Sequence, residues 1–292
     1  MTLENDIKRD VRQFYDQVGW QQVSEGLYQN AHYEDLRPVA RRYIHDCHLR
    51  LLRHLRPQGG YLLDAGSGPI QYPEYLEYSR GYQRRVCADI SIVALQEARQ
   101  RIGAHGLFVV ADIANLPFKP GVFEGAVSLH TIHHLPEQEH LQAYSELHRT
   151  LAQGASAVVV NGWPTSSLMK RFEPLVRISV RLRNLLNRLQ GKETARKARK
   201  EAVRQDVGAE NEIPKGTFTQ RHDVAWVRNE VGARMPVEIY VWRSASVRFM
   251  RALIHPWLAG SLWLRLLYWL EERNPRYFGE NGQYPLIVIK KP

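Results

Sequence analysis

Hydrophobic residues follow two different spacings along this chain of 292 residues. In residues 1–57, apolar side chains recur three and four positions apart, in the segments 6–18 and 36–55, and this spacing predicts helices. From residue 61, short apolar runs alternate with helical stretches. We expect strands at 61–63, 85–88, 107–111, 125–129 and 155–160, with helices at 92–102 and 137–151 among them. Strands that alternate with helices are typical of a parallel sheet built from βαβ units.

The second half of the chain adds helical segments to this sheet. Near 168–190 the apolar side chains form one helical stripe, made of Leu168, Phe172, Leu175, Val176, Leu182, Leu186 and Leu189. A helix near 223–231 and a strand near 237–242 resume the alternation. An apolar helical region follows at 247–272, interrupted by Pro256 and Gly260, and the residues 284–289 have the pattern of a final strand.

These segments predict the organisation of the chain. We expect an N-terminal helical cap at 1–57 and a core at 58–163. A basic helical lid insertion follows at 164–220. The C-terminal part of the core takes up 221–292 and contains an apolar helical insertion at 247–283.

Composition and cysteine usage narrow the class of protein. The apolar content of 44% and charged content of 24% are ordinary for a globular protein with a buried core. Cys47 and Cys87 lie 40 residues apart, so we expect neither a disulfide framework nor a metal site. The first residues are polar and acidic, unlike a secretory signal, and no run of 18 apolar residues suggests a spanning helix. A cytoplasmic protein is the expectation.

Positive charge is concentrated in one segment. Residues 168–205 contain twelve Lys or Arg and three acids, so they account for nine of the ten net positive charges of the chain. Such a segment is suited to a phosphate, to an anionic membrane surface or simply to solvent.

A glycine-containing turn and two further acids indicate a ligand site. Asp64, Gly66 and Gly68 follow the first apolar strand, and small residues in a turn let the backbone approach a ligand closely. Asp89 ends the second strand and Asp112 ends the third. Taken singly, each acid could be a helix cap or a solvated loop residue. Because ligands of such sheets bind at the carboxyl ends of the strands, three acids in these positions point to one crevice.

The two cofactors that use such a crevice differ in what they require. A dinucleotide fingerprint needs a third glycine, but Gly68 is followed by Pro69, Ile70 and Gln71. S-adenosylmethionine carries an amino acid, a ribose and an adenine instead. It needs acceptors for its ammonium, an acid for its ribose and a polar contact for its adenine. The three strand-end acids match those needs, so we expect this cofactor and no metal.

Residues 61–163 resemble the class I S-adenosylmethionine-dependent methyltransferases. They are most similar to the small-molecule branch that includes the ubiquinone and menaquinone C-methyltransferases. The motifs that carry the resemblance are Leu63-Asp64-Ala65-Gly66-Ser67-Gly68-Pro69, Asp89-Ile90-Ser91, Ala111-Asp112-Ile113 followed by Leu116-Pro117-Phe118, and the segment from Val127 to Leu135. The chain departs from the family at Ile70, where a third glycine is frequent.

The resemblance implies a fold and a set of site residues. The fold is a Rossmann-like α/β sheet of seven strands, mostly parallel with an antiparallel last strand, with an N-terminal helical cap and helical lid insertions. The implied cofactor-binding residues are Tyr15, Asp64, Gly66, Ser67, Gly68, Asp89, Ile90, Asp112, Ile113 and His130. His133 and His134 are the candidates for a general base, because they follow the fourth strand beside the expected transfer position. Packing or capping is the competing interpretation, and methyl transfer can also proceed without a base.

The acceptor is less determined by the sequence. The segment 247–272 is rich in aromatic residues with arginines among them, and it could form an apolar pocket or lie in a membrane interface. We therefore expect a small lipophilic acceptor, such as an isoprenoid, a quinone-like ring or a polyketide, with O-, C- and N-methylation all open. Contact with a membrane surface through 168–205 and 247–272 is a further possibility, against that of ordinary lid helices with solvated basic faces.

Two alternative functions belong to other classes. The basic segment 168–205 could serve an RNA methyltransferase by contacting phosphates. No RNA-binding module and no Asn-Pro-Pro-Tyr loop accompany it, so a nucleic acid partner is not expected. A non-catalytic protein that retains the cofactor site is the other alternative, and the intact acids Asp64, Asp89 and Asp112 argue against it.

Overall fold

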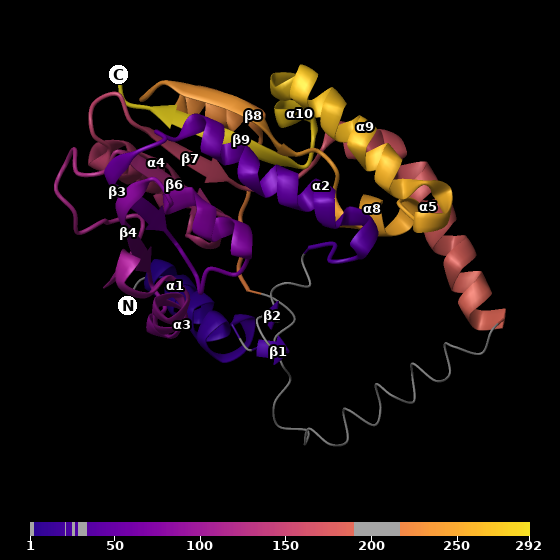
Figure 1. Cartoon of the computed structure of the whole chain (residues 1–292), viewed down its shortest axis with the longest axis horizontal. Coiled ribbons are helices and arrows are strands. Elements are labelled where there is room, and N and C mark those ends of the chain that lie inside the picture. Colours follow the sequence, from indigo (N-terminus) through magenta and orange to yellow (C-terminus); the bar gives the residue numbers. More distant parts are fainter. Residues whose placement is uncertain (1–2, 21, 25–26, 29–33, 190–216) are drawn as a thin grey trace.

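A seven-stranded mixed sheet forms the centre of the computed structural model, which describes residues 3–20, 22–24, 27–28, 34–189 and 217–292 (Figure 1). The strands are β3 (Gly59–Ala65), β4 (Tyr82–Asp89), β5 (Gly106–Val110), β6 (Gly125–Leu129), β7 (Ser156–Val160), β8 (Val237–Arg243) and β9 (Tyr284–Lys290), in the order β5-β4-β3-β6-β7-β9-β8. The pairs among β3 to β7 are parallel, whereas β9 is antiparallel to β7 and β8. This topology confirms the predicted Rossmann-like methyltransferase fold.

The order of the strands fixes where a ligand can bind. From β3 the chain proceeds to β4 and β5 on one side, and then returns to β6 and β7 on the other side. The connections on the two sides of β3 therefore diverge at the carboxyl ends of β3 and β6. In open α/β sheets the crevice at such a switch point is the ligand site.

Helices cover both faces of the sheet, because residues along each strand alternate between two buried clusters. Leu62 and Val158 pack in the cluster that includes side chains of α3 (Ile92–Ile102), η3 (Arg50–His54) and η4 (Pro73–Ser79). Leu63 and Val159 pack in the opposite cluster with α4 (His140–Thr150) and η8 (Val227–Val231). Short elements connect these layers: η5 (Gly103–His105), η6 (Ile132–His134), η7 (Glu137–Glu139) and α7 (Val224–Trp226).

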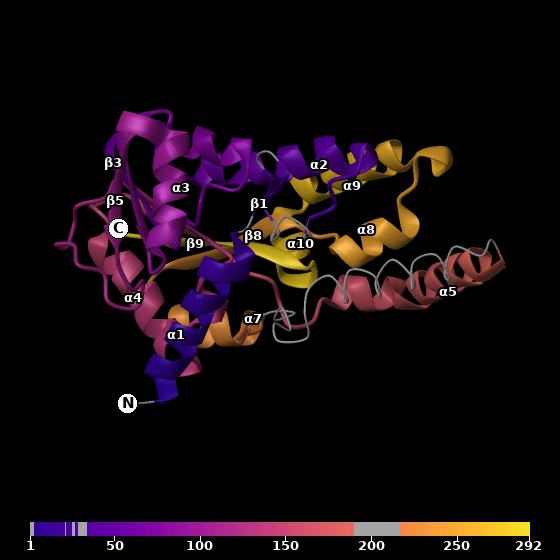
Figure 2. The ribbon, with the colours of Figure 1, turned by 90° about the horizontal axis from the view of Figure 1, so that it is seen from below.

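The remaining helices lie to one side of the sheet. α2 (Pro38–Leu49), α8 (Val247–Leu253) and α9 (Gly260–Arg273) share a third buried cluster around Tyr43, Met250 and Leu264. η9 (Pro256–Leu258) joins α8 to α9, and α10 (Pro275–Asn281) lies beside β8. α5 (Ser167–Leu189) packs on α8, and its far end extends away from the sheet (Figures 1 and 2). No helix in the described ranges is both long and apolar enough to cross a membrane.

The N-terminal residues lie against the carboxyl edge of the sheet. α1 (Leu3–Phe14) continues into the π-helical turn η1 (Tyr15–Gly19), which contacts α3, and the short strands β1 (Gln22–Ser24) and β2 (Leu27–Tyr28) follow. The predicted helix at 6–18 is therefore two elements of different winding. The part of the basic segment at 190–205 lies outside the described residues.

Candidate active site

A cavity of about 630 Å³ lies at the carboxyl ends of β3, β4 and β6. Of the residues that the sequence suggested for cofactor binding or catalysis, those that line it are Tyr15, Asp64, Gly66, Ser67, Gly68, Asp89, Ile90, His130, His133 and His134. Asp112 and Ile113 do not line it. The fold thus brings together residues from η1, three strand ends and η6.

The loop after β3 needs glycine where the backbone is left-handed. Gly66 has φ +74° and Gly68 has φ +55°. A Cβ on Gly66 would lie 2.1 Å from the Cγ2 of Thr131, so any side chain there would displace that residue. The amide of Gly66 donates to the carbonyl oxygen of Ala88 at 2.7 Å, which fastens the loop to the end of β4. The backbone is thereby exposed to the cavity without an intervening side chain.

Ile70 adopts a left-handed conformation as well, with φ +58°. Such a conformation is strained for a β-branched residue and costs roughly 1–2 kcal/mol. The Ile70 side chain is fully buried, and its carbonyl oxygen accepts a hydrogen bond from Arg101 Nη1 at 2.7 Å. The chain thus adopts at Ile70 a backbone conformation that favours glycine, and burial of the side chain offsets the strain.

Asp89, at the end of β4, is a buried acceptor that faces the cavity. Its Oδ2 accepts from the amide of Gly68 at 2.9 Å, and its Oδ1 accepts from the amide of Ser91 at 2.8 Å. Burial raises the pKa of Asp89 to about 6, although those two hydrogen bonds act in the opposite direction. An ionised carboxylate has roughly four acceptor positions, so about two remain for a ligand. Vicinal ribose hydroxyls are donors that fit this arrangement.

Asp64 is held by a buried arginine. Arg85 Nη2 lies 2.5 Å from Asp64 Oδ2, and both side chains are almost fully buried. Arg85 also donates to the carbonyl oxygen of Tyr75. The sequence gives little indication of this pair, since Arg85 follows the polar Gln83 and Arg84 at the start of β4. The guanidinium neutralises part of the Asp64 charge and leaves Oδ1 as the oxygen that accepts no hydrogen bond from a described residue.

Asp112 and Ile113 are placed differently from the other predicted residues. Lys8, from α1, forms ion pairs with Asp112 and with Glu139, the latter at 2.5 Å. The Asp112 Oδ1 accepts from the amide of Ala114 at 2.9 Å, and Ile113 is buried in the core. Asp112 therefore holds the N-terminal helix to the domain, and its adenine contact stays a prediction.

His134 joins the N-terminal segment to the site. Its Nδ1 lies 2.8 Å from the carbonyl oxygen of Phe218, and its Nε2 lies 2.8 Å from the hydroxyl of Tyr15. A carbonyl oxygen can only accept, so the ring proton is on Nδ1 and the Tyr15 hydroxyl donates to Nε2. Burial lowers the pKa of His134 to about 4, and the charge of Arg221 acts in the same direction. The ring is neutral at physiological pH.

His133 and His130 are also neutral but make other contacts. The Nδ1 of His133 lies 3.1 Å from Asn161 Oδ1, and burial lowers the pKa of His133 well below its usual value. His130 has a left-handed backbone, with φ +56°, and its ring meets those of Trp242 and Tyr284 edge to face. Burial lowers the pKa of His130 to about 3. His130 thus lines the cavity, with its ring packed against two aromatic side chains.

Several lining residues have no recognisable sequence motif. Trp20 stacks on Tyr15, with ring centroids 4.9 Å apart, and lies over the glycine loop, 3.1 Å from where a Gly68 Cβ would be. The lining also includes Phe14, Glu34, Gln71, Tyr72, Tyr75, Arg221, Ser246, Val247, Arg248, Arg251, Gln283 and Tyr284. These residues come from separate elements, so only the fold brings them together.

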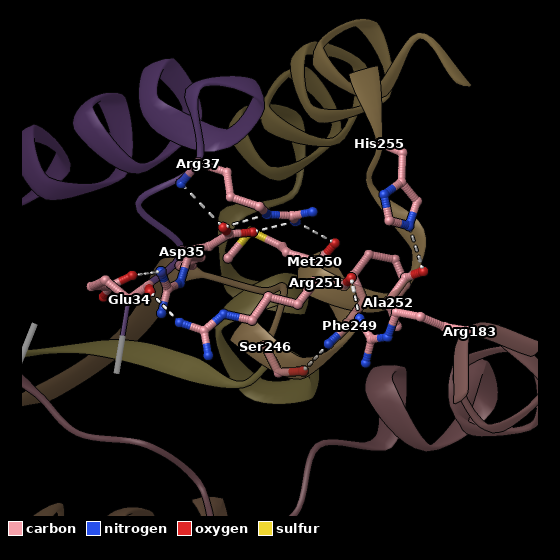
Figure 3. A network of polar contacts seen from close by, with 11 residues as sticks. Glu34, Asp35, Arg37, Arg183, Ser246, Phe249, Met250, Arg251, Ala252 and His255 are labelled. Carbon is pink, nitrogen blue, oxygen red and sulfur yellow. Dashed lines mark hydrogen bonds and ion pairs between the residues drawn. The ribbon is translucent and has the colours of Figure 1, made fainter. Parts of the chain in front are cut away.

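A network of polar contacts holds α8 beside the segment before α2 (Figure 3). Arg251 Nη2 donates to the carbonyl oxygen of Glu34 at 2.8 Å. Arg37 binds the carboxylate of Asp35 and donates to the carbonyl oxygen of Met250 at 2.8 Å. The hydroxyl of Ser246 caps α8 by accepting from the amide of Phe249. These contacts fix the α8 side of the cavity wall.

Comparisons with known proteins agree with this geometry. Residues 63–159 match the family model of a methyltransferase domain. No curated protein matches the sequence. Among solved structures, the chain is similar to the [4+2]-cyclase SpnF, with a TM-score of 0.53, 16% identity and coverage of 97% of this chain and 95% of that one.

Two other solved structures are similar at the same identity. A geranyl diphosphate C-methyltransferase from Streptomyces coelicolor A3(2) has a TM-score of 0.52, 16% identity and 98% coverage of both chains. A putative methyltransferase from Haloferax volcanii, in complex with the Trm112 methyltransferase activator, has a TM-score of 0.51 and 16% identity, over 87% of this chain and 92% of that one.

At such identities the structures show the fold alone, and they do not distinguish the ubiquinone and menaquinone branch from others. The domain match includes the carboxyl ends of β3, β4 and β6 and the loops after them, whereas the N-terminal and C-terminal parts of the cavity lining lie outside it. Residues 63–159 thus form the methyltransferase domain of a class I enzyme, and S-adenosylmethionine is its cofactor.

Proposed function

We propose that the protein transfers the methyl group of S-adenosylmethionine to a small acceptor with a large apolar part. The observation that carries this proposal is one continuous cavity that reaches from Gly68 and Asp89 to the aromatic side chains of Trp20, Tyr72 and Tyr284. Its volume lies within the range of roughly 300–1,000 Å³ that is usual for ligand pockets. Similar structures include an enzyme named for geranyl diphosphate, an isoprenoid.

The chain has residues that suit each part of the cofactor. Asp89 would accept from the ribose hydroxyls, while the backbone of Gly66 to Gly68 and Asp64 would hold the amino acid part. Tyr15 and Trp20 would cover the site from η1. When bound, the cofactor supplies a methyl group activated by a sulfonium. The protein then has to hold the acceptor in line and exclude water, and such positioning can supply much of the rate enhancement.

We further propose that His134 receives a proton from the acceptor through Tyr15. The Tyr15 hydroxyl donates to Nε2 of a neutral imidazole, so it can pass its proton on while it accepts another. An acceptor with a hydroxyl or an acidic carbon would use this route. His133, with Nδ1 engaged by Asn161, is the second candidate.

Binding of the cofactor tests the proposal most directly. Calorimetric titration with S-adenosylmethionine should give one site, and Asp89→Ala should weaken it by at least about tenfold because a charge-assisted hydrogen bond contributes roughly 1.5–3 kcal/mol. Asp46→Ala is the matched control, since Asp46 pairs with Arg42 on α2 and lies outside the cavity lining. Failure of the wild-type protein to bind the cofactor would overturn the enzyme assignment.

A turnover assay separates the remaining alternatives. Methyl transfer from labelled cofactor into isoprenoid and quinone-like compounds supports the proposal, whereas transfer into RNA supports the alternative that uses the basic segment. Cofactor binding without transfer to any acceptor class would favour a non-methylating role, as in the cyclase that shares the fold.

We also propose a peripheral contact with an anionic membrane surface. η9 and α9 expose large apolar side chains, among them Trp257 at 77% and Trp263 at 59%. α5 exposes Leu175, Ile178, Leu182, Leu185 and Leu186, with Arg177, Arg181 and Arg183 among them. Contiguous exposed apolar patches of this kind mark interaction sites, and arginines beside them favour anionic lipid.

A further inference from the structure

The cavity lining contains more positive charge than the methyl transfer itself requires. Arg221, Arg248 and Arg251 all line the cavity. Arg248 and Arg251 are three residues apart on α8 and therefore share one face of that helix. Arg221 comes from the segment that precedes α7.

The nearby carboxylates are engaged elsewhere. Glu34 lines the cavity, but it forms an ion pair with the buried Arg243, which is outside the lining. Glu173, on α5, lies 2.9 Å from Arg248 and also 2.9 Å from Arg177, so one carboxylate serves two guanidinium groups. Among these side chains the guanidinium groups therefore outnumber the carboxylates that pair with them.

Arg221 is the least engaged of the three. Its guanidinium makes no hydrogen bond or ion pair with the residues that the structure describes, and it lines the cavity together with His130, His133 and His134. Thr217 and Thr219, from the same segment, add hydroxyl donors to the cavity lining. A planar guanidinium beside hydroxyl donors is suited to the oxygens of a carboxylate or a phosphate.

The cofactor end does not account for these arginines. Asp89 accepts from the amide of Gly68, and Asp64 already has Arg85 as its cation, so neither strand-end acid pairs with these arginines. Arg221, Arg248 and Arg251 are exposed to solvent at the cavity lining, so an anionic group that enters the cavity can reach them.

We propose that Arg221, together with Arg248 and Arg251, binds an oxyanion group of the methyl acceptor, either a phosphate or a carboxylate. This inference rests on the proposed function, because it assigns the acceptor end of the same cavity. The acceptor is then an amphiphile, with its apolar part against Tyr72, Tyr75 and Tyr284 and its anionic group against the arginines.

The experiment uses the full chain saturated with S-adenosylhomocysteine, titrated at constant ionic strength with inorganic pyrophosphate and, separately, with acetate. We expect at least one of these anions to bind one site, and the tighter of the two identifies the group. Arg221→Gln should weaken that binding by at least about tenfold, which corresponds to one charge-assisted contact of roughly 1.5–3 kcal/mol. Arg234→Gln is the matched control, since Arg234 is exposed and outside the cavity lining.

The outcomes separate the two proposals. If S-adenosylhomocysteine does not bind, the proposed function fails. If it binds but neither anion does, or if Arg221→Gln and Arg234→Gln have equal effects, the anionic subsite alone is overturned. Unchanged affinity for S-adenosylhomocysteine in Arg221→Gln verifies that the variant is folded. Arg248→Gln provides a second variant, and we expect it to weaken the binding of the same anion.

Discussion

Asp89 shows how burial can make a binding residue sensitive to pH. Its pKa is raised to about 6 by burial, so the carboxyl becomes protonated when the pH falls below that value. Protonation removes acceptor positions that ribose hydroxyls would use. A ligand that needs the ionised form therefore binds more weakly as pH falls through about 6, and its affinity is constant above that range.

We therefore expect the dissociation constant of S-adenosylhomocysteine to rise about tenfold at one pH unit below the pKa of Asp89. Calorimetry over a series of pH values measures this dependence. Asp89→Asn should bind weakly at every pH, since it cannot ionise. An affinity that stays flat between pH 5 and pH 7, about one unit on either side of the pKa, would show that Asp89 does not contact the ligand in its ionised form.

The tautomer of His134 is a second residue-scale prediction. Because Nδ1 faces the carbonyl oxygen of Phe218, we expect a neutral ring with its proton on Nδ1 and a pKa near the value of about 4 set by burial. Nitrogen NMR of histidine-labelled protein distinguishes the two tautomers and the imidazolium. Tyr15→Phe should shift only the Nε2 resonance, through loss of its donor. Titration of His134 near the usual histidine pKa would show that burial does not lower its pKa, and a proton on Nε2 would refute the proposed relay from Tyr15.

At the scale of elements, α9 is fastened to α2 by one buried carboxylate. Glu271 is fully buried and lies 2.7 Å from Arg50 Nη2 and 2.7 Å from the hydroxyl of Tyr43. It also accepts from the amide of Ser244 at 3.0 Å. Removal of Glu271 leaves Arg50 with only the partly exposed Glu272 and takes the acceptor from the Tyr43 hydroxyl and the Ser244 amide. Breaking a buried pair of this kind costs about 3–5 kcal/mol.

We expect Glu271→Ala to lower the free energy of unfolding by that amount, and its neighbour Glu272→Ala to lower it by no more than about 1 kcal/mol. Glu272 is the matched control because it pairs with Arg50 and Arg53 but is partly exposed. Chemical denaturation of both variants gives the comparison. Equal losses would mean that burial does not distinguish the two carboxylates.

The elements of the core follow from sequence pattern because each has one buried face. The predicted strand at 125–129 and the predicted helix at 92–102 have the bounds of β6 and α3. Strands such as β4 extend beyond the predicted range, since their first residues, which include Arg84, are polar but still pair in the sheet. The short helix η4 has no such pattern, as it begins at a proline and spans only seven residues. α10 lies within the helical insertion expected at 247–283.

The residue pattern predicts the candidate site where a residue follows a strand, whereas Tyr15, on η1, is expected from the family resemblance alone. Asp64 and Asp89 occupy the cavity because parallel strands end at one edge. Asp112 also follows a strand in the sequence, but its carboxylate forms an ion pair with Lys8 of α1 and does not line the cavity. Trp20 and Arg221 belong to no strand end, and nothing in the spacing of the sequence relates them to Gly68. Contacts between distant segments are set by packing, which periodicity does not encode.

At the scale of the whole molecule, the apolar surface is unevenly distributed. α5, η9 and α9 lie to one side of the sheet, and they contain many of the exposed large apolar side chains (Figure 2). Elsewhere such residues are scattered, as with Tyr61 and Val110 on the sheet. Scattered apolar residues are normal on any surface, whereas a concentration on projecting helices indicates an interface.

If the exposed apolar side chains of α5, η9 and α9 bind a lipid surface, the binding depends on lipid and salt differently than if they bind a second copy of the chain. A symmetric dimer would bury Trp257 and Trp263 in protein and would form at the same concentration with or without lipid. An anionic bilayer would bury them at the headgroup boundary and would attract the arginines of α5, so its binding would weaken as salt is added.

Co-sedimentation with vesicles distinguishes these cases. We expect binding to vesicles that contain phosphatidylglycerol and much less to pure phosphatidylcholine. The double variant Trp257→Ser and Trp263→Ser should lower the partition coefficient by about tenfold or more, since each large apolar side chain contributes roughly 1.5–3 kcal/mol on burial. Tyr61→Ser, an exposed aromatic on β3, is the matched control and should leave partitioning unchanged. Two outcomes would contradict the membrane proposal: equal binding to charged and uncharged vesicles, or a stable dimer that the double variant dissociates. The dimer would indicate that the apolar surface binds protein.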